Sequence, residues 1–265
     1  MDKNICFVLG AGGARGIAHV GFLQAMEDND IKPDCIVGCS MGSIVGACYA
    51  KGVTPAKMKE VAESLKKNDI IDVAPDFIFK KGLLKSVKMQ LKLEHLLGDV
   101  TFDGLNIPFE CVAVDLITGN PITLNSGLVE SSVRASSSIP LVFNPVMKDG
   151  MELVDGAILV RVPVENAKHF NAKVVIAVDV LGVAPKKEVP NKNILDVGLR
   201  TVDVADSFHT NKYLKKHKPD VLVVPDLGDM SQFKVDKLSF AYEQGYKAGV
   251  DNVEKIKKVI AKKLK

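Results

Sequence analysis

The chain has 265 residues, of which 47% are hydrophobic and 25% are charged. These values exclude a disordered or fibrous protein, and the length suits one substantial α/β domain or at most two small ones. The formal net charge of +3 is too small to indicate a nucleic-acid partner.

The five cysteines do not form a recognisable framework. Their number is odd, no C-x-x-C pair occurs, and four of them lie in apolar runs where a buried thiol is expected. No metal-ligand spacing is present, so we expect neither a metal nor a cofactor. The N-terminus is interrupted by glycine too early for a signal peptide, and no apolar run approaches the ~20 residues of a membrane span. These features favour a cytoplasmic protein and leave peripheral contact with a membrane open.

Short apolar runs alternate along the chain with longer segments of helical periodicity. This alternation predicts an α/β protein with a mostly parallel central sheet. The expected strands are 5–9, 34–37, 108–116, 121–124, 152–154, 174–181 and 220–224. The expected helices are 16–29, 42–51, 128–138, 194–216, one that Thr54 caps before Pro55, and a long one at the C-terminus. Lys148-Asp149-Gly150 predicts a tight hairpin turn.

The segment 68–104 is the least regular part of the chain. An apolar run at 76–79 and an amphipathic stretch at 83–97 would expose more apolar surface than a core helix does. It is either a lid or substrate-approach element, or a cover on one edge of the sheet. Because the sequence shows no internal repeat and no flexible linker, we expect one domain over 1–265.

Residues 38–42, Gly-Cys-Ser-Met-Gly, match G-x-S-x-G. The motif lies between a predicted strand and a predicted helix of small residues, which is the context of a nucleophile elbow. Such a turn leaves almost no room for side chains at Gly38 and Gly42, and it raises the Ser40 hydroxyl at the carboxyl edge of the sheet. The first amides of the following helix, from Met41 onward, face any oxyanion that forms there. We therefore predict Ser40 as a nucleophile.

A glycine loop at 10–16, GAGGARG, also follows a strand and opens a helix. A dinucleotide site would require an acidic residue at the end of the second strand, where the motif of Ser40 lies instead. A phosphate-binding P-loop would require lysine and then serine or threonine after Gly16, which is followed by Ile17. Both nucleotide hypotheses fail on this context. An oxyanion hole built from backbone N–H groups fits it.

The group that activates Ser40 is not settled by spacing. An ordinary serine hydrolase uses a histidine, but His19 is expected to pack or cap, and the other four lie in poorly placed segments: His95, His169, His209 and His217. Asp155 follows an apolar strand and precedes Gly156 and Ala157, so it is expected to be buried and to need a partner. Ser40 is one candidate partner, and spacing alone leaves this assignment open.

In combination, these motifs resemble the patatin-like phospholipases, particularly small stand-alone bacterial members. The resemblance rests on the glycine loop ending Ala-Arg-Gly, GCSMG, RASSSIPLVFNPV at 134–146 and DGA at 155–157, motifs that together span 9–157. It implies a three-layer α/β/α fold and hydrolysis of acyl esters of phospholipids, lysophospholipids or other lipids. It also implies a Ser–Asp dyad without histidine, here Ser40 and Asp155, and an oxyanion hole from the glycine loop, here Gly12, Gly13, Ala14 and Arg15.

Ala11 departs from the family pattern, which usually has a glycine at this position. An alanine is costly where the backbone must adopt a positive φ. If the loop requires that conformation at Ala11, the oxyanion donors would be displaced and the rate reduced.

The C-terminus allows two interpretations. The last eleven residues carry six lysines, and Val253, Ile256, Ile260 and Leu264 share one helical face. Such a helix could lie on an anionic membrane surface, or it could pack on the sheet with its lysines in solvent. Two rival functions are a weakly active lipid sensor or regulator on the same fold, and a nucleotide-binding enzyme, which the missing acidic residue and lysine already weaken. The sequence leaves the head group, the acyl-chain length and the oligomeric state undetermined.

Overall fold

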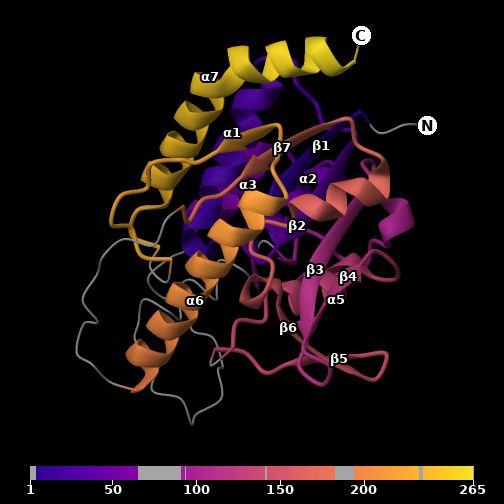
Figure 1. The fold of residues 1–265 in the computed structure, drawn as a ribbon, viewed down its shortest axis with the longest axis vertical. Helices are drawn as coiled ribbons and strands as arrows, with labels where there is room; N and C mark the ends of the chain where they lie inside the picture. Colours follow the sequence, from indigo (N-terminus) through magenta and orange to yellow (C-terminus); the bar gives the residue numbers. More distant parts are fainter. Residues whose placement is uncertain are drawn as a thin grey trace.

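The computed structural model describes residues 4–64, 91–92, 94–140, 142–182, 194–232 and 235–264. Most of the predicted lid or approach segment, 68–104, lies outside these residues. Within them, an eight-stranded sheet forms the centre of the protein, with helices on both of its faces (Figure 1).

The sheet is parallel at its centre, as predicted. Its parallel strands are β1 (Ile5–Leu9), β2 (Cys35–Cys39), β3 (Phe109–Asp115), β7 (Val174–Val178) and β8 (Val221–Val223). Three strands pair antiparallel at one side: β4 (Asn120–Leu124), β5 (Val146–Lys148) and β6 (Met151–Asp155). The order is β5-β6-β3-β2-β1-β7-β8, with β4 also paired to β3. The expected α/β class and mostly parallel sheet are confirmed.

The helices also agree closely with the expected segments. They are α1 (Ile17–Glu27), α2 (Met41–Lys51), α3 (Pro55–Glu63), α5 (Val129–Ser136), α6 (Ile194–Lys216) and α7 (Leu238–Lys263). Thr54 caps α3 by accepting a hydrogen bond from the Lys57 amide at 3.3 Å. Asp149 and Gly150 both have positive φ, as a two-residue hairpin turn requires. The short strand β5 was not predicted, because three residues are too few to show an alternating pattern.

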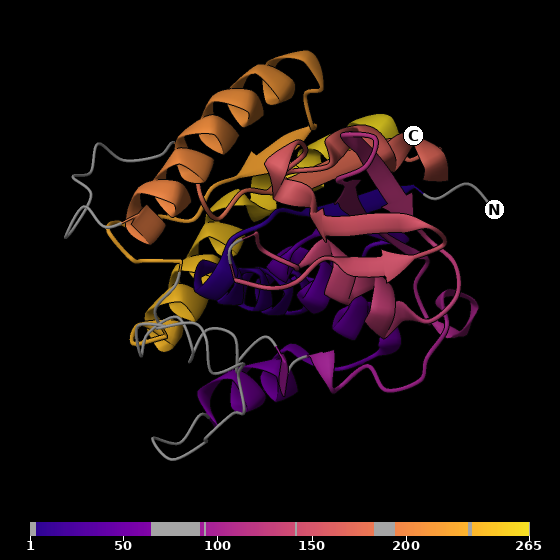
Figure 2. The ribbon, with the colours of Figure 1, turned by 90° about the horizontal axis from the view of Figure 1, so that it is seen from below.

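Two hydrophobic cores lie on opposite faces of the sheet. On one face, Phe7 and Leu9 of β1 belong to a large cluster with α1, α2 and α7. On the other, Cys6 and Val8 pack with Val164–Phe170, a short 3-10 helix, and with α6. Figure 2 shows α6 on the side of the sheet opposite α2 and α3. The fold is therefore the expected three-layer α/β/α arrangement, and all five cysteines are buried within it and form no disulfide.

The pairing register brings the ends of β2 and β6 together. Val112 of β3 pairs with Cys39 on one side and with β4 on the other. The next residue, Ala113, pairs with Asp155 and again with β4. Because β4 occupies one edge of β3 throughout, β2 and β6 share the other edge and meet end to end. The residue after β2 and the last residue of β6 are thus neighbours by topology.

The apolar face of the C-terminal helix packs on the core. Val253 and Ile256 are buried, and Ile260 and Leu264 pack against the same cluster. This face is occupied by the protein itself, which favours the second of the two interpretations of the basic C-terminus. Among the described helices, none has both the length and the apolar composition that crossing a membrane requires.

Helices α1 and α7 approach so closely that glycine is required between them. A Cβ on Gly21 would lie 2.0 Å from the Tyr242 carbonyl oxygen, and one on Gly245 would lie 1.9 Å from that of Ala18.

We expect Gly21→Ala to lower the free energy of unfolding by about 1–3 kcal/mol, although alanine favours an isolated helix. Urea unfolding measures this. Gly104→Ala is the control, because its nearest neighbour is the Val100 side chain at 3.3 Å; an equal loss there would contradict the explanation.

Candidate active site

Ser40 occupies a strained turn between β2 and α2. Its backbone has φ 53° and ψ −126°, a conformation that non-glycine residues rarely adopt. A Cβ on Gly42 would lie 2.1 Å from the Leu9 carbonyl oxygen, and one on Gly38 would lie 2.5 Å from the Ser43 Cα. The flanking glycines are therefore required by close packing, and the geometry is that of a nucleophile elbow.

The structure brings Ser40 and Asp155 into direct contact. The Ser40 hydroxyl donates to Asp155 Oδ2 at 2.6 Å, and Asp155 Oδ1 accepts from the Ala157 amide at 2.9 Å. Asp155 is only 4% exposed. Burial raises the pKa of Asp155 to about 7, although the hydrogen bonds from Ser40 and Ala157 act in the opposite direction. The carboxyl group is thus far more basic than an ordinary aspartate.

Two residues of the serine run 136–138 hold this pair in place. Ser136 Oγ accepts from the Ser40 amide at 3.1 Å and donates to the Val112 carbonyl at 2.7 Å. The Ser138 carbonyl accepts from the Asp155 amide at 2.9 Å. The sequence RASSSIP marks the family resemblance, but it does not by itself predict a role for these serines. Their available signal was the run of small polar residues at the end of a helix.

The glycine loop places its positive φ at Gly13 and not at Ala11. Gly13 has φ 52°, whereas Ala11 is absent from the residues with positive φ. The Ala11 amide donates to the Arg161 carbonyl at 3.0 Å. The alanine that departs from the family pattern therefore introduces no backbone strain.

The amides of the loop divide into two groups. Ala14 donates its amide to the Gln232 carbonyl at 2.8 Å, and Arg15 donates its amide to Gly12 at 3.1 Å. In this conformation Ala14 and Arg15 are thus not the open oxyanion donors that the resemblance implied. Within the described residues, the amides of Gly12 and Gly13 donate no backbone hydrogen bond. They remain the candidate donors of the loop, together with Met41 at the start of α2.

The Arg15 side chain anchors the chain that covers the loop. Its guanidinium donates to the carbonyls of Met230 at 2.6 Å and Gly228 at 2.8 Å. The opening of α1 is packed just as closely, because a Cβ on Gly16 would lie 2.2 Å from Met41 Cγ. Arg15 and Gly16 thus hold the loop against its neighbours.

The hydroxyl of Ser40 is bonded to a carboxylate, and the nearest histidine in sequence is engaged elsewhere. His19 Nε2 lies 2.7 Å from the Gly10 carbonyl oxygen. His19 is fully buried, and burial lowers its pKa to about 4. It therefore packs beneath the glycine loop as a neutral ring. His169 binds Glu110 and His217 approaches Glu165, both away from the dyad.

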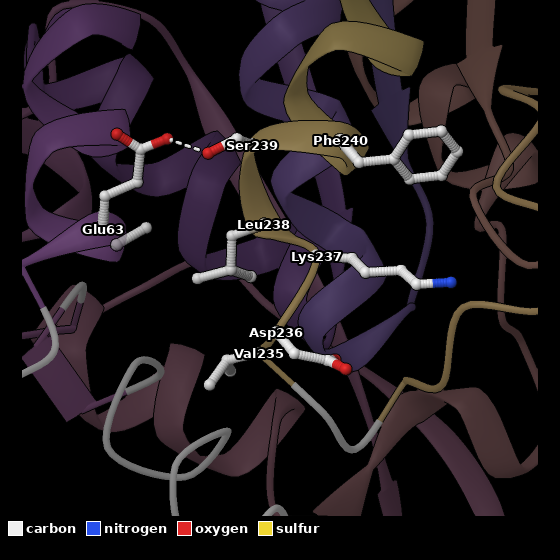
Figure 3. Close-up of a pocket in the computed structure, with 8 residues that line it drawn as sticks. Glu63, Val235, Asp236, Lys237, Leu238, Ser239 and Phe240 are labelled. Carbon is white, nitrogen blue, oxygen red and sulfur yellow. Dashed lines mark hydrogen bonds between the residues drawn. The ribbon is translucent and has the colours of Figure 1, made fainter. Parts of the chain in front are cut away.

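A separate pocket of about 520 Å³ lies between the end of α3 and the start of α7 (Figure 3). It is lined by Ala62, Glu63 and residues 235–240. Ser239 Oγ donates to Glu63 at 2.8 Å across its wall. Neither Ser40 nor Asp155 lines this pocket, so it is not the immediate surroundings of the dyad.

Asp155→Asn is expected to stabilise the folded protein at pH 8 and to do so less at pH 5. The folded pKa of about 7 lies above the ordinary value of 3.8, so the native state loses stability as pH rises from 3.8 to about 7, where the carboxyl is ionised in the unfolded chain but still protonated in the native state. At about 1.4 kcal/mol for each pKa unit, the gain above pH 7 is at most roughly 4 kcal/mol. Thermal unfolding at both pH values measures it.

Asp115→Asn is the control for this prediction. Hydrogen bonds from Thr118 and nearby amides lower the pKa of Asp115, so its charge stabilises the protein above the ordinary pKa. The same substitution there should destabilise the protein at pH 8. Equal behaviour of the two variants would contradict the role of burial at Asp155.

Comparison with known proteins agrees with these motifs. The model of the family described as patatin-like phospholipase matches residues 7–168. An uncharacterized NTE family protein of Mycobacterium tuberculosis is 34% identical over 181 residues, which are 68% of this chain and 50% of that protein. Lysophospholipase nte1 of Aspergillus fumigatus is 32% identical over 191 residues, 67% of this chain and 12% of that protein.

The fold has a solved counterpart as well. The crystal structure of VipD from Legionella pneumophila matches with a TM-score of 0.54 at 14% identity, over 99% of this chain and 67% of that one. At this identity the likeness concerns the fold alone. The chain spans about half the length, or less, of the curated relatives cited here. Since the family model covers more than half of the chain and includes the motifs of both Ser40 and Asp155, the chain belongs to the patatin-like phospholipase family.

Proposed function

We propose that this protein is a serine hydrolase that cleaves acyl esters of lipids through a Ser40–Asp155 dyad. The observation that carries the proposal is the 2.6 Å hydrogen bond between the Ser40 hydroxyl and the buried Asp155 carboxylate. The bond lies at a strained turn between a strand and a helix, where a serine is held for attack.

In the first step, Ser40 Oγ attacks the ester carbonyl carbon and its proton passes to Asp155. An ordinary aspartate is a poor base toward a hydroxyl, but a pKa near 7 lets Asp155 be both ionised and basic at neutral pH. The tetrahedral oxyanion is stabilised by the amides of Gly12 and Gly13, with Met41 at the positive end of α2 as a further donor.

The second step releases the enzyme. Collapse of the tetrahedral intermediate expels the alcohol, which takes the proton from Asp155 and leaves an acyl ester on Ser40. Asp155 then accepts a proton from water as the water attacks this ester. The acid leaves and the proton returns to Ser40, so the dyad needs no histidine and no metal for its proton balance.

Lipid acyl esters are the proposed substrate class. The support is the family itself and a relative named as a lysophospholipase. Phospholipids and lysophospholipids are the first substrates to test, followed by other acyl glycerides. Because this chain spans only part of those relatives, its substrate must be measured directly.

Labelling with a fluorophosphonate probe tests the nucleophile. The wild-type protein should label at Ser40 and hydrolyse a short p-nitrophenyl ester, whereas Ser40→Ala should do neither. Asp155→Asn should lower kcat by at least about 10³-fold, since it removes the base. Ser131→Ala is the control and should retain activity, because this half-buried serine of α5 donates its hydroxyl to the Leu128 carbonyl. A wild-type protein that folds but neither labels nor turns over would instead favour a lipid-binding or regulatory role.

The pH dependence provides a second test. Because Asp155 must be ionised to accept a proton, kcat/KM should rise with pH and level off above the pKa of about 7. An ordinary aspartate would place this rise near pH 4. Initial rates between pH 5 and 9 measure it, and a flat profile over this range would contradict the proposed base.

A further inference from the structure

Arg161 is a buried arginine enclosed by acidic groups. Its side chain is 3% exposed, and its guanidinium donates to Asp206 at 2.7 Å and to Asp179 at 2.8 Å. It also donates to the Gly182 carbonyl at 2.8 Å. Asp179 and Asp206 are themselves nearly buried. Three charged side chains thus meet in the interior of the protein. One of them, Arg161, lies only six residues after Asp155 in the chain.

Such a cluster is an inefficient way to stabilise a fold. Removing three charges from water is costly, and apolar side chains of the same size often stabilise an interior as well or better. The cluster also has one more carboxylate than it has cations. Its location relative to the dyad and the glycine loop is therefore the informative property.

The backbone of Arg161 holds one side of the glycine loop. Its carbonyl accepts from the Ala11 amide at 3.0 Å, immediately before Gly12. A Cβ on Gly10 would lie 3.0 Å from Val162 Cγ2, which shows how closely the loop packs on this segment.

The guanidinium of Arg161 holds the other side of the loop through a turn. Asp179 Oδ1 accepts the amides of Leu181 and Gly182, both at 3.2 Å, while Oδ2 binds Arg161. Val180 of this turn packs against Gly12, because a Cβ added to Gly12 would lie 2.2 Å from Val180 Cγ2. The Asp179 carboxylate thus joins Arg161 to the turn whose Val180 side chain packs against Gly12.

Asp206 connects the same arginine to the dyad. It lies on α6, which packs against the 3-10 turn Gly156–Ile158 that follows Asp155. Asp206 Oδ1 accepts from Thr210 at 3.1 Å, so its second oxygen is oriented toward Arg161. The groups around Asp155 are then the Ser40 hydroxyl, the Ala157 amide, the buried Cys39 thiol and the Asp206 charge.

We propose that Arg161 is a positioning residue that sets the glycine loop for oxyanion binding and holds the Asp206 charge beside Asp155. Arg161 touches no reacting atom in this assignment. It acts on Gly12 and Gly13 through Ala11 and Val180, and on Asp155 through α6. The inference rests on the proposed Ser40–Asp155 chemistry.

Two consequences differ from a purely structural role. Arg161→Lys keeps the charge but loses the planar fork that reaches two carboxylates and a carbonyl together. A shift of the loop by about 1 Å is expected to lower kcat by about 10²-fold with little change in KM. Asp206→Asn removes a negative charge that helps to raise the pKa of Asp155, so it should move the rise of kcat/KM to lower pH.

The experiment compares four variants by thermal unfolding, steady-state kinetics on a p-nitrophenyl ester and pH profiles. Asp179→Asn is matched to Asp206→Asn, because it removes the other carboxylate of Arg161, which is not among the charges acting on Asp155. Asp179→Asn should lower kcat and leave unchanged the pH at which kcat/KM rises. Glu110→Gln is the control for burial: Glu110 is 1% exposed and binds Asn166 and His169 at the amino end of β3. It should alter stability and leave kcat and the pH profile as in the wild type.

Contrary outcomes separate this inference from the proposed function. If Ser40→Ala and Asp155→Asn abolish activity but a folded Arg161→Lys retains wild-type kcat, the positioning role is wrong and the dyad stands. Identical pH profiles for Asp206→Asn and Asp179→Asn would overturn the link between Asp206 and Asp155. If Arg161→Lys does not fold, the Asp206 and Asp179 pair decides the matter. A folded wild-type protein without activity would overturn both proposals.

Discussion

The meeting of β2 and β6 on one edge of β3 is the constraint on which the site depends. Both strands pair with β3, β2 in parallel and β6 antiparallel, and their ends adjoin at Val112 and Ala113. Ser40 follows the first strand and Asp155 ends the second, so the backbone pairing itself brings the hydroxyl to 2.6 Å from the carboxylate. Residues 115 positions apart in the chain thus become a hydrogen-bonded pair without a flexible connection.

This arrangement places an ionisable group where its charged form is costly. Asp155 is enclosed by protein, and burial opposes its charged form. The same burial makes its carboxyl group basic enough to accept a proton near neutral pH. The neighbouring segment also holds costly buried charges, because Arg161 pairs with two further carboxylates in the interior. Two buried ionisable side chains, Asp155 and Arg161, thus lie within one short stretch of the chain.

Close backbone packing supplies the rest of the precision. Gly38, Gly42 and Gly156 each leave no room for a methyl group beside neighbouring backbone, and Gly12 leaves none beside Val180. The positive φ of the loop falls on Gly13, where a Cβ would lie 2.4 Å from the Gln232 carbonyl oxygen. The segment that carries Gln232 is in turn held by Arg15. The candidate oxyanion donors are therefore positioned by contacts from distant parts of the chain.

Much of this protein was determined by local sequence. The alternation of apolar runs and helical periods predicted the α/β class and nearly every described element, because burial of one helix face or of a whole strand leaves a short-range pattern. G-x-S-x-G between a strand and a helix predicted Ser40 as the nucleophile by the same local logic. The assignment of Asp155 needed the family resemblance in addition, since spacing alone left it open.

Tertiary structure decided what depends on contacts across the chain. Which loop amides are free follows from Gln232, which is 218 positions after Ala14 in sequence. The C-terminal helix has an amphipathic pattern that suits a membrane or a core equally well, and its packing on α1 favours the core. The contacts of Ser136, Arg161 and Asp206 could likewise not be predicted from the sequence, because they depend on partners that only the fold brings close. Local patterns record which surface a residue buries; they do not record which distant group it meets.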